Sequence, residues 1–107
     1  MSIQIPRGHT DEIINEFVEV LKAYEVDHPL AQIDIYRQNP VSIRVRIVDS
    51  SFKGLEKSDR HARVWKYLEK LSDDVQDDLS MLVLLTPAEV SRSFANMEFE
   101  DPVPSLL

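Results

Sequence analysis

Residues 41–68, "VSIRVRIVDSSFKGLEKSDRHARVWKYL", contain the change of hydrophobic period that decides the fold. Up to Val48, apolar side chains occupy every second position, which is the pattern of a strand with one buried face. Beyond Gly54, apolar side chains recur at helical spacing, first at Val64 and then at Leu68. A glycine at such a junction lets the chain reverse with a positive φ. The stretch therefore predicts a strand, a tight connector and a helix.

A second alternating run precedes this strand. Ile33 and Ile35 alternate with polar residues and are followed by Asn39-Pro40, a pair typical of turns. An antiparallel hairpin with one buried face is predicted. Arg44 and Arg46 fall on the opposite face, where the commoner interpretation is a solvated sheet surface. The functional interpretation is a small basic patch.

Helices are predicted on both sides of the hairpin. Before it, Thr10 is suited to an N-cap, and the apolar spacing predicts a helix from Asp11 to about Tyr24. Pro29 then disfavours helical geometry at the residue before it. After the connector, Ser58 or Asp59 is predicted to cap a helix of roughly three turns.

The last third of the chain predicts one more strand and one more helix. "SDDVQDD" (72–78) is interpreted as an acidic, solvated loop, and the apolar run 79–85 as a strand. Thr86-Pro87-Ala88-Glu89 has the pattern of a capping box, with threonine at N-cap and glutamate at N3. A third helix is therefore expected from about Pro87 to Met97.

Together these elements predict a single α/β (α+β) domain in the order α-β-β-α-β-α. Because a helical crossover joins the second and third strands, they should be parallel, in a three-stranded mixed sheet with helices on one face. The domain is placed at residues 10–98, between a flexible lead-in (1–9) and a loose tail (99–107). The expected core is Val45, Ile47, Leu68, Leu82, Leu84 and Phe94.

Composition disfavours some classes of function and excludes others. The formal charge of −7 opposes nucleic-acid phosphate and anionic lipid at long range. The absence of cysteine removes disulfides, thiolate metal sites and thiol nucleophiles. No apolar run approaches membrane-spanning length and no signal segment is recognisable, so a cytoplasmic protein without a membrane partner is expected.

Catalytic motifs are also absent from the sequence. There is no nucleophile elbow, no zinc-binding H-E-x-x-H helix and, with two glycines, no phosphate-cradling loop. The carboxylates of residues 73–78 lack the spacing and the glycine of a calcium loop. A protein that is not an enzyme and needs no cofactor is therefore expected.

The stretch quoted first resembles the BolA family. The residues that carry the resemblance are Phe52, Gly54, Arg60, His61, Val64 and Leu68. In that family a strand ends in an F-x-G turn, and a helix then opens with an Arg-His pair. The resemblance covers residues 10–98, with usable motif in 41–90, and implies a class II KH-like fold. That fold coincides with the order predicted from periodicity.

The chain departs from the family at the positions that carry metal chemistry. Members that act with monothiol glutaredoxins share an iron–sulfur cluster through a histidine just before the last strand. Asp78 stands there, and the hairpin loop "RQNPVS" lacks the second ligand. A carboxylate is a poor ligand for such a cluster, so cluster binding in the family's manner is not expected, and His61 is only a weak alternative ligand.

The leading hypothesis is a BolA-like regulatory or adaptor domain that binds a protein partner, with a glutaredoxin-like protein as one candidate. The residues expected to bind the partner are Phe52, Lys53, Gly54, Arg60, His61, Arg44 and Arg46. For His61, a partly buried histidine bonded to the connector is the simpler interpretation. The first alternative is a transcription-related nucleic-acid binder, but the connector "GLEK" lacks the second glycine of a KH clamp. Its phosphate contacts would be Arg44, Arg46, Lys53, Lys57, Arg60 and Arg63.

Overall fold

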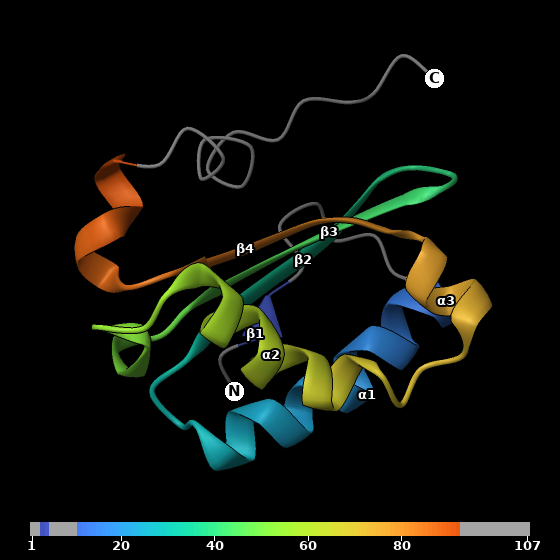
Figure 1. Cartoon of the computed structure of the whole chain (residues 1–107). Helices are drawn as coiled ribbons and strands as arrows, with labels where there is room; N and C mark the ends of the chain where they lie inside the picture. Colours follow the sequence, from blue (N-terminus) through green and yellow to red (C-terminus); the bar gives the residue numbers. More distant parts are fainter. Residues whose placement is uncertain (1–2, 5–10, 93–107) are drawn as a thin grey trace.

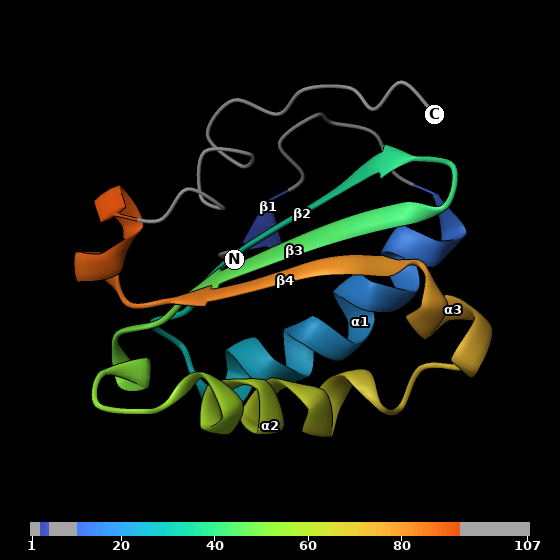
Figure 2. The ribbon, with the colours of Figure 1, turned by 45° about the horizontal axis from the view of Figure 1, so that its top comes forward.

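The computed structural model describes residues 3–4 and 11–92, which form a twisted sheet with helices along one face (Figures 1 and 2). The elements are β1 (Ile3–Gln4), α1 (Glu12–Asp27), β2 (Gln32–Asn39), β3 (Ser42–Val48), the 3₁₀ helix η1 (Ser50–Phe52), α2 (Lys57–Leu68), α3 (Asp73–Asp77), β4 (Leu79–Leu85) and the 3₁₀ helix η2 (Pro87–Arg92). Within these ranges no helix is long and apolar enough to cross a bilayer.

The predicted three-stranded mixed sheet is confirmed. β2 and β3 pair antiparallel with Ile35 opposite Val45, and β3 and β4 pair parallel with Ile47 opposite Leu84. The strand order is β1-β2-β3-β4, so β4 forms one edge of the sheet. β1, in the segment predicted to be a flexible lead-in, adds two residues parallel to β2 at the other edge. Two residues are too few to produce a hydrophobic period, so no pattern could have predicted this strand.

The core lies between α1, α2 and one face of the sheet (Figure 2). Of the predicted core residues, Val45, Ile47, Leu68 and Leu84 are buried there, and Leu82 is partly buried against them. Phe94 lies outside the described residues. A smaller cluster on the opposite face contains Tyr36, Val83, Met81 and Leu85.

The predicted helix starts need correction. Asp11 was predicted to be the first residue of the helix, but it is the N-cap of α1. Its carboxylate accepts a hydrogen bond from the Ile14 N–H at 2.9 Å. Thr10 lies outside the described residues. Ser58 and Asp59 were wrong as caps of α2, because the backbone is already helical from Lys57 and the carbonyl of Glu56 accepts the first bonds. α1 continues to Asp27 and ends at His28, before Pro29.

Two predictions for residues 72–92 are also corrected. The acidic segment is not a loop but contains the short helix α3, because Ser72 caps it and Val75 anchors it in the core. The contacts of the predicted capping box are present in part, since the Thr86 N–H donates to the Glu89 carboxylate at 2.8 Å. The element that follows is a 3₁₀ helix rather than an α-helix as far as Arg92, and residues 93–97 lie outside the described ranges.

Candidate functional site

The connector between β3 and α2 is fixed by the buried side chain of Phe52 and by hydrogen bonds to Asp49. Phe52 is fully buried in the core, and Gly54 has a φ of 82°, the positive value that its position predicted. Asp49, at the end of β3, accepts hydrogen bonds from the backbone N–H and the hydroxyl of Ser51, both at 2.8 Å. The sequence therefore folds this segment into a fixed turn, which sets where α2 begins.

A buried polar cluster joins this turn to the end of α1. The hydroxyl of Tyr24 donates to the Asp49 carboxylate at 2.8 Å, and His28 stacks on the Tyr24 ring with the ring centroids 4.4 Å apart. Burial and the neighbouring carboxylate raise the pKa of Tyr24. Burial opposes the ionisation of Asp49, but the hydrogen bonds from Ser51 and Tyr24 outweigh it and hold the pKa of Asp49 below its usual value. The cluster thus links the end of α1 to the connector through an ionised Asp49.

Arg60 is turned into the molecule, where it joins three segments. Its guanidinium donates to the carbonyls of Leu55 and Leu84, both at 3.1 Å, and makes a forked contact with Glu89 at 2.7 and 3.3 Å. It also lies 5.6 Å from the centroid of the Phe52 ring, within range of a cation–π contact. Hydrogen bonds from Arg60 and from the Thr86 N–H lower the pKa of Glu89 to about 2.

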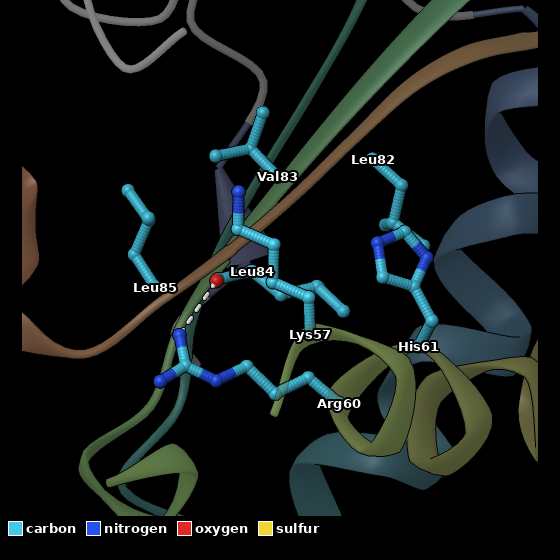
Figure 3. A pocket seen from close by; sticks show the side chains of 7 residues that line it. All are labelled: Lys57, Arg60, His61, Leu82, Val83, Leu84 and Leu85. Atoms are coloured by element: carbon cyan, nitrogen blue, oxygen red, sulfur yellow. Dashed lines mark hydrogen bonds between the residues drawn. The ribbon is translucent and has the colours of Figure 1, made fainter. Parts of the chain in front are cut away.

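A groove runs between the first turns of α2 and β4 (Figure 3). Its volume is about 190 Å³, and its lining is Lys57, Arg60, His61, Leu82, Val83, Leu84 and Leu85. Figure 3 shows Lys57, Arg60 and His61 projecting from α2 toward the strand. The lining contains no carboxylate, although the whole chain carries a charge of −7. The groove is therefore a locally basic, largely apolar surface at the edge of the sheet.

Arg60 also separates this groove from a second hollow. That hollow has a volume of about 430 Å³ and lies between the connector turn and the start of η2. Its lining is Ser50, Lys53, Gly54, Arg60, Thr86, Pro87, Ala88 and Glu89. Lys53 and Gly54 are exposed at its rim, and in the described part of the chain Lys53 has no ion-pair partner.

The residues predicted to bind a partner do not form one surface. Phe52 is fully buried in the core, Arg60 is buried except where its side chain lines the groove, and His61 is half-buried in the groove. Arg44 and Arg46 alternate with the core residues of β3 and so lie on the sheet face away from α2. They are partly buried, and Arg46 donates to the Asp34 carboxylate at 2.8 Å.

The structure adds residues that sequence reasoning missed as part of the leading site. Lys57 was named only as a phosphate contact, and Leu82 only as a core residue, yet both line the groove. Glu89 was interpreted only as a cap, although it also fixes Arg60. No local pattern signals such residues, because they meet only when β4 takes the edge position. The spacing of Lys57 and His61 at i, i+4 was the one usable signal, since it places both on one side of α2.

The histidines and acids do not gather into a metal site. Within residues 3–4 and 11–92, no three His, Asp or Glu side chains are close enough to hold an ion together. Asp78, at the position where the BolA family has a cluster ligand, instead accepts from Arg37 at 3.4 Å. His61 lies by Leu82 in the groove rather than beside Asp78.

Comparisons with known proteins define the class of this fold. No protein-family model matches the sequence, and no curated protein matches it. Among solved structures, BolA1 from Arabidopsis thaliana aligns with a TM-score of 0.51 and 20% identity, over 70% of this chain and 95% of that one. The chain therefore has a BolA-like fold, as the residues around Phe52 and Arg60 predicted. At this identity the likeness establishes the fold alone, and function has to be argued from the site.

Proposed function

We propose that this protein is a non-enzymatic BolA-like regulatory or adaptor domain that binds a protein partner in the groove between α2 and β4. The observation that carries the proposal is the composition of β4. Its seven residues, "LSMLVLL", form a sheet edge with no charge and no proline. Natural proteins usually blunt an edge strand with such residues or cover it. An apolar edge with which no other strand of the described residues pairs, beside a basic helix, therefore favours a partner that covers it.

The groove is poor in groups that would support catalysis. Its polar side chains are Lys57, Arg60 and His61, and the guanidinium of Arg60 is already bound to Glu89 and two carbonyls. His61 has no acidic residue in the groove lining to orient it and no nucleophile beside it there. These contacts support a binding role rather than a reaction. A glutaredoxin-like protein remains one candidate partner that the BolA-like fold suggests.

Nucleic acid is the weaker alternative. Of the six cations that could have contacted phosphate, Arg60 is bound to Glu89 and Arg46 to Asp34. Arg44 lies on the sheet face away from α2, so Lys53, Lys57 and Arg63 are the cations left on one side, and Arg63 already donates to the Ser51 hydroxyl at 2.7 Å. Three contacts would give a log–log salt slope of about −3 on duplex DNA. Anisotropy titrations with duplex and single-stranded probes should therefore give weak, non-specific binding at physiological salt.

The proposed function is tested by site-specific photocrosslinking in the source cell. A photoreactive phenylalanine derivative replaces Lys57 in one variant and Lys66 in the control. Lys66 lies about two and a half turns further along α2, so it projects from the opposite side. A protein crosslinked from position 57 but not from 66 is expected. Equal products from both positions, or nucleic acid as the product at 57, would contradict the proposal.

A further inference from the structure

We infer that the partner binds by β-strand addition: an extended acidic segment pairs with the open edge of β4 and directs carboxylates at Lys57. This inference rests on the proposed function and names the kind of partner. Strand addition is a general mode of peptide recognition, in which main-chain hydrogen bonds supply affinity and alternate side chains supply specificity. β4, the groove and the charges beside it are the three observations that support it.

On the outer side of β4, some backbone groups have no partner among the described residues. The carbonyl of Leu85 accepts from the Asp49 N–H at 2.9 Å, so Leu85 faces the β3 side of the strand. In a strand the N–H and C=O of successive residues alternate in direction, so Leu84 faces outward. Its carbonyl does accept from Arg60, outside the sheet, at 3.1 Å. By the same alternation Leu82 faces outward, and the described residues provide no partner for its N–H or C=O beyond β4.

Arg60 sets the limit of the added strand. It occupies the outward carbonyl of Leu84 and is itself fixed by Glu89, so a peptide cannot donate to that carbonyl without displacing the arginine. Pairing is therefore centred on Leu82, whose two groups remain available, with the N–H of Leu84 as one further donor. Such a site accepts a short extended segment rather than a long strand.

The side chains around this edge select for acidic residues. Lys57 has no ion-pair partner in the described part of the chain, and His61 adds a second polar group one helical turn along. A strand placed beside β4 would lie at the usual spacing of about 4.8 Å, within reach of the long Lys57 side chain that Figure 3 shows over the groove. Four leucine and valine side chains complete the lining, which suits an apolar residue alternating with the acids.

A second copy of this chain fits the same edge less well. Two chains would each bring a charge of −7, and β4 itself offers no carboxylate to the Lys57 of a partner. An acidic peptide supplies that charge locally. Self-pairing of β4 is therefore a competing outcome that the experiment has to detect.

The experiment titrates the full-length protein against a fluorescein-labelled heptapeptide, Asp-Val-Glu-Val-Glu-Val-Asp with blocked ends, by fluorescence anisotropy. One control peptide carries Lys at every acidic position, and another carries N-methyl groups at alternate residues to remove backbone donors. Losing two backbone hydrogen bonds should weaken binding about tenfold. Weaker binding of both controls is expected.

Protein variants test the two halves of the inference. Lys57→Glu should weaken the acidic peptide about tenfold, whereas Lys66→Glu, with the same change of charge on the opposite side of α2, should leave the affinity unchanged. Leu82→Pro removes the outward N–H without removing a bond to β3, since proline is tolerated at such edge positions. It should abolish binding. If Leu82→Pro fails to fold, hydrogen exchange on the unmodified protein replaces it: the Leu82 amide should become protected when the peptide is added.

Each outcome separates this inference from the proposed function. A crosslink from position 57 in the cell without peptide binding, or with equal binding of the N-methylated peptide, would overturn strand addition and leave the partner-binding role standing. A dimer in sedimentation equilibrium that Leu82→Pro abolishes would overturn the acidic segment in favour of a second copy of the chain. Peptide binding that needs Lys57 and protects Leu82 would support the inference.

Discussion

One arginine at each end of the sheet links several segments by hydrogen bonds, and the two arginines differ in how far their contacts are buried. At the hairpin end, Arg37 donates to Asp11 at 2.7 Å and to the carbonyl of Pro40 at 2.9 Å, with Asp78 further away at 3.4 Å. At the connector end, Arg60 makes its forked contact with Glu89 and donates to two carbonyls. The Arg37 side chain is 18% exposed and that of Arg60 is 9% exposed.

The Arg37 side chain is therefore nearer the surface than the Arg60 side chain. Asp11 is 41% exposed and Glu89 is 36% exposed, so water reaches the carboxylate partner at both ends. The carbonyl of Leu84 and the ring of Phe52 are buried around Arg60, and water reaches them poorly. The connector end therefore relies on a buried contact with the Leu84 carbonyl, whereas the contact with the Pro40 carbonyl at the hairpin end is exposed. The groove and the open edge of β4 lie at the end that depends on Arg60.

The largest expected effect is that of Arg60→Ala. Removing a buried arginine that binds two carbonyls and a carboxylate that is 36% exposed should lower the free energy of unfolding by roughly 2 to 4 kcal/mol. Urea denaturation followed by circular dichroism measures it. Arg60→Lys should recover only part of the loss, because an ammonium group cannot reproduce the forked contact. A loss of unfolding free energy below about 1 kcal/mol would mean that Arg60 contributes no more than an exposed ion pair does.

Arg37→Ala should cost less, about 1 to 2 kcal/mol, because its partners are partly solvated. Repeating the urea denaturation in high salt should shrink this loss, since exposed ion pairs are screened. The Arg60→Ala loss should shrink by a smaller fraction, because its contact with the Leu84 carbonyl is buried. If Arg37→Ala destabilised the protein as much as Arg60→Ala, the contrast between the two ends would be wrong.

Gly54→Ala tests the backbone of the connector end. No atom lies within 4 Å of the position where a Cβ would stand, so the cost comes from the φ of 82° alone. About 1 kcal/mol of destabilisation is expected. Gly54→Asn should cost less, because asparagine tolerates this conformation better. Equal losses for the two variants in thermal unfolding would point to a steric cause instead.

The last expected effect is on the pH dependence of stability in acid. The pKa of Glu89 is about 2 in the folded protein against an ordinary value of 4.5, so its contribution to stability is complete above pH 4.5 and is lost as the pH falls toward 2. Glu89→Gln should therefore flatten the dependence of unfolding free energy on pH in that window. Asp11→Asn, at the hairpin end, is the matched control and should flatten it less. Identical slopes for wild type and Glu89→Gln would contradict the assignment.

Sequence patterns predicted most of the fold because periodicity reports which side chains are buried. The alternation through Val45 and Ile47 and the run 79–85 gave the strands, and Gly54 gave the turn. Patterns could not reveal which way a charged residue faces. Arg60 was predicted to meet a partner from its place in the motif, but it turns inward because Glu89, 29 residues away, fixes it. The groove was missed for the same reason, since it depends on which strand occupies the edge.

The parallel pairing of β3 with β4 also determines what the chain exposes while it folds. The hairpin of β2 and β3 can close locally, but β4 can join only after a crossover that includes α2 and α3. Pairing across such a separation is slow compared with hairpin formation. Until then β3 is itself the outer strand, and the charges of Arg44 and Arg46 along it discourage pairing with other nascent chains. We therefore expect these two arginines to limit aggregation before the sheet is complete.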